Sequence, residues 1–278
     1  MLEINYVNTV KSIQYGHTRG KAPVIDFHLH DGYEIYFLLS GDVNYFIEKK
    51  VYPIKYGDLF ITNNHEIHKP SFQSQAPYER IILQFDPSMV KPFNSPTFDL
   101  LHCFVNRPKG EQNKLSLNKN QLEDIMRIFD KFEELDTSSS NGSDILKLIY
   151  LVELLVFLNR IFVSTQHVEE HPNVPDKLIP VLDYIDENLE ADLSLELLEQ
   201  RFFINRFHLS RLFKKSTGSN IHQYVIFKRV SKAKKLLSEG FSVTETCALS
   251  GFSDYSNFIR TFKKTTGISP GQYKKRYA

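Results

Sequence analysis

The 278-residue chain has little cysteine, since only Cys103 and Cys247 are present. Two isolated thiols exclude a disulfide framework and offer no zinc-finger spacing, so a reducing, cytoplasmic location is expected. The first residues, MLEINYVNTV, have neither the basic start nor the apolar run of a signal peptide. The longest apolar stretch, 145–163, contains three charged side chains, which are costly in hydrocarbon. We therefore expect no membrane partner and interpret this stretch as a buried or interface helix.

Acidic residues are scarce in the last part of the chain. Residues 201–278 hold 16 Lys and Arg but only three acids, a net charge of +13. Residues 1–200 hold 18 basic and 30 acidic residues, a net charge of −12, so the formal net charge of +1 conceals a strong asymmetry. A basic segment joined to an acidic one favours a nucleic-acid-binding module over a merely solvated basic surface.

Residues 22–85 have the pattern of β structure. Short runs rich in Tyr, Phe and Ile are separated by turn signals such as Ser40-Gly41-Asp42 and Asn63-Asn64. Many short strands at this spacing predict a sandwich or small barrel. The expected strands are 34–39, 43–48, 58–61 and 80–85. Residues 86–118, which include four prolines, are expected to be irregular.

From residue 118 the apolar period changes to three and four, which predicts an amphipathic helix up to the TSSSNGS turn. A second predicted helix, from 144 to about 163, is apolar on more than one face. Such a helix either forms a dimer interface or packs on the barrel, and the pattern leaves both open. The expected fold is α+β: a β domain at 1–118, a helical segment at 119–165, a linker at 166–176 and an all-α domain at 177–278.

An internal repeat at an offset of 49 residues is the most informative feature. NRFHLSRLFKKSTGSNIHQY at 205–224 aligns with DYSNFIRTFKKTTGISPGQY at 254–273, with eight identical pairs. Repeats indicate the folding unit. Each copy has the order of a helix-turn-helix: a short helix capped by serine, a turn, and a second helix that ends at glycine. The glycine of the second turn, Gly251, suits a left-handed backbone.

The second helix of each copy has an outward face suited to a major groove. Arginine can donate two bonds to guanine, whereas lysine near the helix end suits phosphate. The outward residues include Arg206, Ser210, Arg211 and Lys214 in the first copy, and Tyr255, Arg260 and Lys263 in the second. Residues 228–239 are expected to form a helix that links the copies.

The segment from Gly251-Phe252-Ser253-Asp254 through Phe262-Lys263-Lys264 to Ser269-Pro270 and Tyr273 closely resembles the second unit of the AraC/XylS family of transcription regulators. The resemblance covers about residues 175–278. It implies that both recognition helices lie in successive major-groove segments about one turn apart. Carried over by position, the base-reading residues are Phe207, Ser210, Arg211, Tyr255, Ser256, Asn257 and Arg260.

The first unit departs from the family pattern at two positions. Phe203 stands where a turn glycine is usual, and Glu199 stands where a small alanine packs. These departures leave open whether the first unit reads bases as tightly as the second.

His28, His30 and Glu34, followed by Gly41, resemble the first cupin motif, and Gly57-Asp58 with His68 loosely resembles the second. In cupin enzymes such a set holds a catalytic metal. In AraC-like regulators a similar barrel binds a small effector, often a sugar, without metal. Two interpretations stay open: an effector pocket lined by His28, His30, Glu34, Tyr36 and His68, or a divalent metal held by His28, His30, Glu34 and His68.

The sequence therefore predicts a non-enzymatic regulator, with activation and a sugar effector taken from the family. The resemblances imply a cupin-like effector-binding domain at 1–118, a helical dimerisation segment at 119–165 and an AraC-type DNA-binding domain at 177–278. Its expected partners are double-stranded DNA, a small-molecule effector, a second copy of the chain and RNA polymerase; no resident cofactor is expected. The alternative is a metal-dependent cupin enzyme with a helical appendage. The basic repeat favours the regulator.

Overall fold

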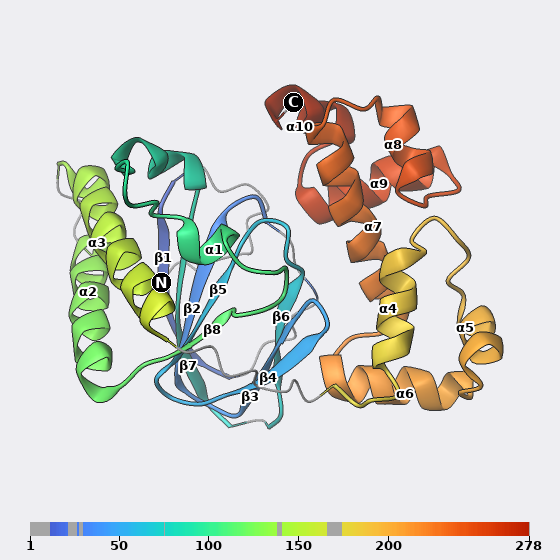
Figure 1. The fold of residues 1–278 in the computed structure, drawn as a ribbon, viewed down its shortest axis with the longest axis horizontal. Coiled ribbons are helices and arrows are strands. Elements are labelled where there is room, and N and C mark those ends of the chain that lie inside the picture. Colours follow the sequence, from blue (N-terminus) through green and yellow to red (C-terminus); the bar gives the residue numbers. More distant parts are fainter. Residues whose placement is uncertain are drawn as a thin grey trace.

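The computed structural model describes residues 12–21, 27, 30–74, 76–137, 141–165 and 174–277. An N-terminal part made of β-sheets and two long helices lies beside a C-terminal part made only of helices (Figure 1). This arrangement confirms the predicted α+β class.

The N-terminal part contains two antiparallel sheets. The larger sheet has the order β1 (Gln14–Gly20), β7 (Tyr78–Phe85), β2 (Tyr33–Ser40), β5 (Asp58–Thr62) and β8 (Lys114–Ser116). The smaller sheet has the order β4 (Lys50–Ile54), β3 (Val43–Ile47) and β6 (His68–Phe72). The four predicted strands correspond to β2, β3, β5 and β7. Sequence analysis missed β4 and β6, which contain Pro53 and Pro70, because proline is tolerated only at the edge of a sheet, where both strands lie.

Apolar side chains fill the space between the two sheets. Tyr36 and Phe60 of the larger sheet pack with Tyr45, Ile47 and Tyr52 of the smaller one in one buried cluster. On strand β2 the residues Glu34, Tyr36 and Leu38 alternate with Ile35 and Phe37, which belong to a second cluster on the other side of the sheet. The period of two in β2 therefore gives the larger sheet one face toward the smaller sheet and one face toward helices. The two facing sheets together are called the barrel below.

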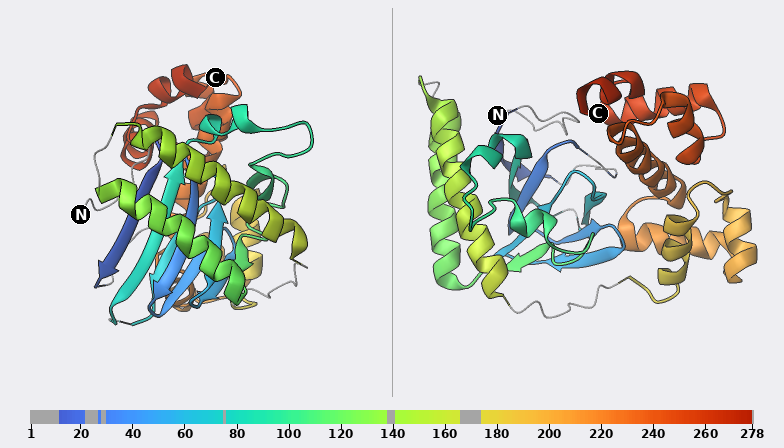
Figure 2. Two further views of the ribbon diagram at one scale, coloured as in Figure 1. Left: turned by 90° about the vertical axis from the view of Figure 1, so that its left-hand side faces the viewer. Right: turned by 45° about the horizontal axis from the view of Figure 1, so that its top comes forward.

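Helices α2 (Lys119–Thr137) and α3 (Ser143–Ser164) cover the outer face of the larger sheet (Figure 2). Their bounds agree with the predicted helices to within about one residue. Asn159 of α3 is buried and pins the helix to the preceding segment, since its amide donates to Leu100 O and accepts from Cys103 N–H, both at 2.8 Å. No helix among the described residues, α3 included, combines the length and apolarity that crossing a bilayer requires.

The segment 86–118 is less irregular than the sequence suggested. Besides β8 it contains the 3-10 turns η1 (Pro87–Met89) and η2 (Lys91–Phe93) and the short helix α1 (His102–Val105). These elements are three or four residues long, which is too short to produce a detectable period in the sequence. Most of the predicted linker, residues 166–173, lies outside the described residues.

The C-terminal part contains seven helices within 174–277, and α7 joins two packed units. Its helices are α4 (Ile179–Glu187), α5 (Leu195–Phe202), α6 (Arg206–Thr217), α7 (Ile221–Ser238), α8 (Val243–Leu249), α9 (Tyr255–Thr266) and α10 (Pro270–Tyr277). The predicted caps are present, since Ser194 and Ser242 accept from backbone N–H groups at the starts of α5 and α8. Gly218 and Gly267 end α6 and α9 in left-handed conformation.

The turn after α5 and the turn after α8 both place one residue in the left-handed backbone conformation, but the residue differs between the two units. Gly251, after α8, has a φ of 87°, as expected for a left-handed position. Phe203, after α5, has a φ of 53° although it carries a large side chain. A left-handed backbone costs an ordinary residue about 1–2 kcal/mol. The first unit therefore keeps the turn of the second at an energetic cost.

We predict that Gly251→Ala lowers the free energy of unfolding by about 2 kcal/mol or more, because a left-handed alanine is strained and its Cβ would overlap the carbonyl of Leu189. Gly271→Ala is the matched control, because nothing lies near its Cβ in α10 and alanine favours helix by about 0.5–1 kcal/mol. Urea unfolding of the full chain measures both. Equal stability of the two variants would contradict this account of the turn.

Candidate nucleic-acid interface and ligand site

The second helix of each unit, α6 or α9, buries one side and presents the other to solvent. Leu209 and Phe213 anchor α6 in a cluster with α4, α5 and α7, and Phe258 and Phe262 anchor α9 against α7, α8 and α10. All four side chains are fully buried. Because these anchors recur at a step of four, the opposite face of each helix is left to solvent.

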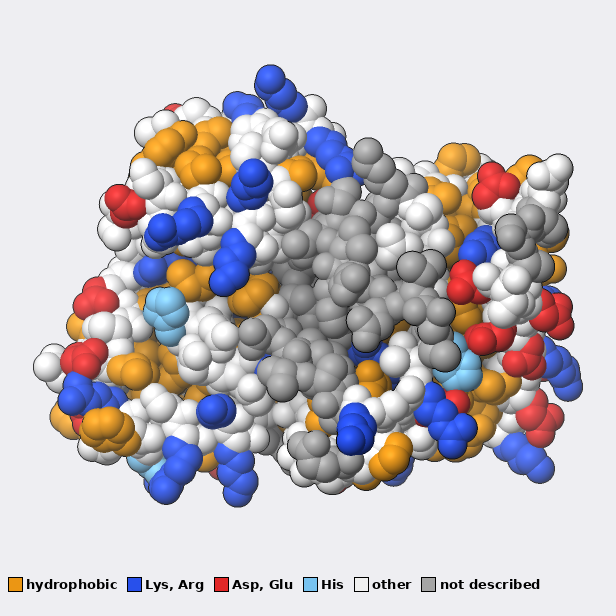
Figure 3. Space-filling model, turned by 180° about the vertical axis from the view of Figure 1, so that it is seen from behind, with side chains coloured by type: hydrophobic (Ala, Val, Ile, Leu, Met, Phe, Trp, Pro, Cys, Tyr) orange, Lys and Arg blue, Asp and Glu red, His pale blue; other side chains and the backbone are white. Residues whose placement is uncertain are grey.

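Eight of the ten predicted DNA-contact residues are exposed on these faces. They are Phe207, Arg211, Lys214, Tyr255, Ser256, Asn257, Arg260 and Lys263. Ser210 is half-buried. In the second unit, Arg260 Nη2 donates to Asn257 Oδ1 at 3.2 Å, so a hydrogen bond joins two of the predicted base-reading side chains on the same helix face. Figure 3 shows Lys and Arg side chains spread over the half of the molecule that the helix-turn-helix units form.

Arg206 differs from the other predicted contacts, because acids of α5 hold it. Its guanidinium donates to Glu196, and its backbone N–H donates to Glu199 Oε1 at 3.2 Å. Glu199 thus caps the start of α6, which gives the unusual glutamate of the first unit a structural role. Arg206 is therefore an ion-paired residue at the edge of the surface, and it is a weaker candidate for base contact than Arg211.

The second predicted site lies inside the barrel, where the structure brings together three of the predicted ligands. His30, Glu34 and His68 are each at most 1% exposed, and one ligand atom of each lies within 4.8 Å of the others. Glu34 is on β2, His68 begins β6 and His30 precedes β2. His30 Nε2 lies 3.2 Å from Glu34 Oε2, and His68 Nε2 lies 3.5 Å from Glu34 Oε1.

Two residues that the sequence did not single out complete the surroundings of Glu34. Tyr45 donates its hydroxyl to Glu34 Oε1 at 2.8 Å, and Gln84 donates its amide to Oε2 at 2.7 Å. Burial opposes ionisation, but the imidazoles of His68 and His30 hold the pKa of Glu34 well below its usual range. Burial likewise disfavours a charged imidazole, yet the Glu34 carboxylate raises the pKa of His68. The cluster is thus a buried, charged site.

Two predicted ligands remain, Tyr36 and His28. Tyr36 is buried on the same face of β2 as Glu34, and its ring packs against Tyr45 at 4.7 Å between centroids. Tyr36 belongs to the apolar cluster between the two sheets, beside the three polar residues. His28 lies outside the described residues.

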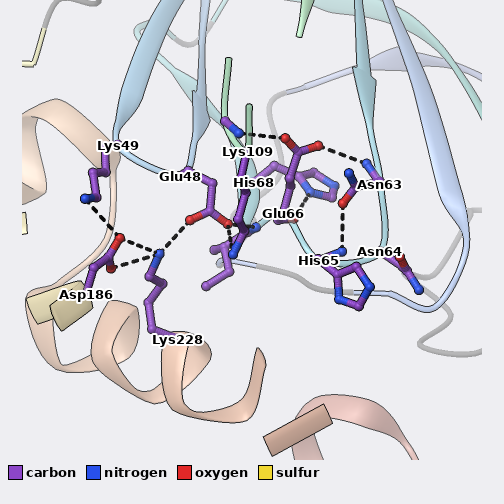
Figure 4. Close-up of polar contacts among 12 residues, drawn as sticks. Glu48, Lys49, Asn63, Asn64, His65, Glu66, His68, Lys109, Asp186 and Lys228 are labelled. Atoms are coloured by element: carbon purple, nitrogen blue, oxygen red, sulfur yellow. Dashed lines mark hydrogen bonds and ion pairs between the residues drawn. The ribbon is translucent and has the colours of Figure 1, made fainter. Parts of the chain in front are cut away.

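A buried ion network joins the barrel to the helical part (Figure 4). Glu48 follows β3, and its Oε2 lies 2.6 Å from Lys228 Nζ on α7. Lys228 also reaches Asp186 of α4 at 2.8 Å, and Lys109 reaches Glu48 from the barrel side at 3.1 Å. Tyr224, fully buried one turn before Lys228, packs its ring against Phe46 of β3. A cavity of about 990 Å³ opens beside this network.

Comparison with known proteins agrees with this architecture. The family described as AraC-like ligand binding domain matches residues 13–155, and a helix-turn-helix domain family matches residues 198–276. The chain belongs to the AraC family. The two matches cover the barrel with its helices and most of the helix-turn-helix units, which are the parts that carry the two candidate sites.

Relatives of this AraC-family chain include an uncharacterized HTH-type transcriptional regulator of Staphylococcus aureus, 27% identical over 254 residues that make up 90% of this chain and 32% of that protein. The chain thus spans about a third of the length of these curated relatives. The multiple antibiotic resistance protein MarA of Salmonella typhimurium is 34% identical over 34% of this chain and 75% of MarA. Among solved structures, ToxT from Vibrio cholerae is 14% identical, with a TM-score of 0.38 over 96% of this chain and all of that one.

Sequence analysis did not predict the contact between the barrel and helix α7, which we call the junction. Lys228 and Lys234 are among the most buried residues of α7, although lysine is a surface residue by default. They follow Tyr224 and Ser231 at steps of three and four, so they share a face that the apolar stripe did not reveal. Their ion-pair partners in the barrel, Glu48 for Lys228 and Asp31 for Lys234, are far away in the sequence, so local patterns could not reveal these contacts.

We predict that Glu48 makes folding stability depend on acid pH. Burial would raise the pKa of Glu48, but Lys228 and Lys109 outweigh it and lower that pKa from 4.5 to about 2. Because the folded pKa lies below the unfolded one, the ionised carboxylate adds stability above about pH 4.5, and this contribution is lost as the pH falls toward about 2. Glu48→Gln should be less stable at pH 7 and lose less stability on acidification.

Urea unfolding at several pH values between about 7 and 3 measures this difference. Glu123→Gln, on the exposed face of α2, is the control and should follow the native chain. If Glu48→Gln and Glu123→Gln show the same pH dependence, the ion network does not hold the two parts together.

Proposed function

We propose that this chain is a DNA-binding transcription regulator that responds to a small ligand held in the barrel. The observation that carries the proposal is the pair of exposed faces on α6 and α9, each anchored by buried aromatic or aliphatic residues and each bearing an arginine at the repeated position, Arg211 and Arg260. Basic residues at this spacing suit phosphate contact, and the arginines suit guanine.

Specific recognition would use both units. On the outward face of α9, Tyr255, Ser256, Asn257 and Arg260 are exposed, and all but the ring of Tyr255 are polar. The start of α6 is more apolar, since Phe207 is 72% exposed and Phe203 is 95% exposed. An exposed aromatic ring can contact the thymine methyl group, whereas Arg260 and Asn257 can donate to base edges. The two units would therefore read different features of one site.

The ligand would act through the barrel. Residues His30, Glu34 and His68 form a buried polar site between the sheets, and polar groups in an apolar enclosure are what a specific small-ligand site requires. A ligand changes DNA binding only if its affinity differs between two arrangements of the protein. The ion network around Glu48 provides a junction that could differ between them. Sugar as ligand and activation through RNA polymerase remain predictions from the family.

The rival cupin-enzyme function has one observation in its favour, the His30, Glu34 and His68 cluster. Against it, these three side chains are at most 1% exposed within the described part of the chain. A pair of basic helix-turn-helix units also serves a DNA-binding regulator and has no role in such an enzyme. We therefore favour ligand binding over turnover.

A dimer is the assembly that we propose for the regulator. On α3 the residues Ile145, Ile149, Val152, Val156 and Val163 follow one another at steps of four, three, four and seven. Ile145, Ile149 and Val163 are 61%, 53% and 72% exposed, and the two valines between them are half-buried. This is the spacing of a coiled-coil seam, and a second copy of α3 would cover it.

The DNA-binding proposal is tested with gel shifts on promoter fragments from the same genome. Arg260→Ala and Arg211→Ala should each weaken specific binding by about 5- to 150-fold, because one bidentate arginine–guanine pair is worth about 1–3 kcal/mol. Lys263→Ala should weaken specific and non-specific binding alike and flatten the salt dependence. Arg127→Ala, an exposed arginine on α2, is the control and should bind as the native chain does. Equal binding by all four variants would refute the proposal.

The dimer proposal is tested by light scattering after size exclusion. The native chain should elute as a dimer, and the double variant Ile145→Glu, Ile149→Glu should elute as a folded monomer, because both side chains are exposed within one copy. Val105→Glu, which charges an exposed apolar residue outside α3, should remain dimeric. A native chain that is monomeric at micromolar concentration rules out this interface.

A further inference from the structure

Each histidine of the barrel cluster is followed in the chain by a residue whose side chain points away from the barrel interior. That side chain forms polar contacts with one of the helix-turn-helix units. Asp31 follows His30, and Lys69 follows His68. On β6 this is a result of the strand period, since neighbouring side chains point to opposite faces: His68 points inward to Glu34, and Lys69 points outward. Asp31 and Lys69, which contact the helical units, are therefore direct sequence neighbours of the two histidines of the cluster.

Asp31 holds the second unit. Its Oδ1 lies 2.8 Å from Lys234 Nζ on α7, and its Oδ2 accepts the hydroxyl of Tyr277 on α10 at 2.9 Å. The pair of Asp31 and Lys234 is buried, with both side chains at most 4% exposed. Lys234 also donates to the carbonyl of His30 at 3.4 Å, so α7 contacts the histidine segment itself. Removal of either member would leave the other as an uncompensated buried charge, which is strongly destabilising.

Lys69 holds the first unit. Its ammonium donates to the carbonyl of Gly218 at 2.8 Å and to the hydroxyl of Ser219, directly after the C-terminus of α6. A cation is favoured at this end of a helix, where carbonyl groups point outward and the helix dipole is negative. The recognition helix of the first unit thus ends on a side chain of the barrel strand that carries His68.

The two histidines present the arrangement of metal ligands. His30 Nδ1 donates to Gly32 O at 2.7 Å and His68 Nδ1 donates to Glu66 O at 2.8 Å, since a carbonyl can only accept. A metal ion that takes the place of the proton on Nε2 leaves the imidazole neutral and bonded through that nitrogen, and both Nε2 atoms face Glu34. A backbone carbonyl on the far nitrogen is the usual support of a metal-bound histidine.

The dimensions of the cluster fit a small divalent ion. His30 Nε2 lies 3.2 Å from Glu34 Oε2 and His68 Nε2 lies 3.5 Å from Glu34 Oε1, and one ligand atom of each residue lies within 4.8 Å of the others. A tetrahedral ion with bonds of about 2.0–2.2 Å separates its ligand atoms by about 3.3–3.6 Å. Two imidazoles and one carboxylate suit first-row transition ions such as Zn²⁺ or Fe²⁺ and leave a position for a further ligand. The oxygen-preferring ions Mg²⁺ and Ca²⁺ are disfavoured by the two nitrogen ligands.

We propose that His30, Glu34 and His68 bind a divalent first-row transition metal ion, and that its occupancy tightens the hold of Asp31 and Lys69 on the two helix-turn-helix units. An ion bonded to both histidines fixes the two segments that carry these residues, so the docked arrangement gains the binding free energy of the metal. This inference rests on the proposed function. It names the class of ligand and the contacts through which ligand binding affects the DNA-binding helices.

Metal binding is tested with the metal-free full chain and Zn²⁺ alone. After dialysis, elemental analysis should find one Zn²⁺ per chain in the native protein and in His65→Gln, an exposed histidine three residues before His68. Glu34→Gln and His68→Gln should each bind Zn²⁺ at least about tenfold more weakly. Circular dichroism verifies that both are folded, and either folded variant suffices for the comparison. Absence of stoichiometric zinc in the native chain, or equal affinity in the ligand variants, overturns the metal site.

The coupling is tested by hydrogen exchange with and without Zn²⁺. In the native chain, Zn²⁺ should slow exchange at the C-terminal end of α6, in α7 and in α10. Asp31→Asn should keep the zinc but lose the slowing in α10, and Lys69→Met should keep the zinc but lose it at the end of α6. Unchanged exchange in all three helices of the native chain overturns the coupling.

The outcomes separate this inference from the proposed function. Zinc content and hydrogen exchange are measured without DNA, and the gel shifts on Arg260→Ala are made without metal. A chain that binds promoter DNA but no zinc refutes only the inference, whereas a chain that binds zinc but no DNA refutes only the regulator.

Discussion

The contact between Glu48 and Lys228 is the interaction on which the arrangement of the whole molecule depends. Both side chains are at most 7% exposed and come from opposite parts of the chain. Each is surrounded by opposite charge, Glu48 by Lys228 and Lys109 and Lys228 by Glu48 and Asp186, which offsets the cost of burying it. Buried ion pairs contribute little net stability compared with apolar packing, but they tolerate few alternative geometries. The apolar contacts of Tyr224 with Phe27 and Phe46 would permit sliding, and the ion pair fixes the position.

Helix α7 carries Lys228 and packs against both helix-turn-helix units, so its position determines where both units lie. Its first half packs with α4, α5 and α6, and its second half packs with α8, α9 and α10. Lys228 and Lys234 lie almost two turns apart on it and reach two different segments of the barrel. A rigid helix held at two points cannot rotate about its own axis. The barrel therefore influences the orientation of both recognition helices through one element.

Much of this molecule could be predicted from local sequence. Asn205, Gly218 and Gly251 predicted caps and turns because their effects depend on neighbours within a few residues. His30, Glu34 and His68 could be grouped because a known motif carries them. Asp31 and Lys69 could not, since nothing local distinguishes a surface charge from one that is buried against a partner about 150–200 residues away. Long-range pairs of opposite charge leave no period in a single sequence.

The two prolines of the smaller sheet bear on how copies of this chain can meet. Pro53 and Pro70 lie in β4 and β6, which are the two outer strands of that sheet. Each proline removes a backbone N–H from an otherwise open row of donors and acceptors. Such a row would offer a template on which a foreign strand could extend the sheet. With the template interrupted on both sides, the smaller sheet is poorly suited to continue into a sheet of a second copy.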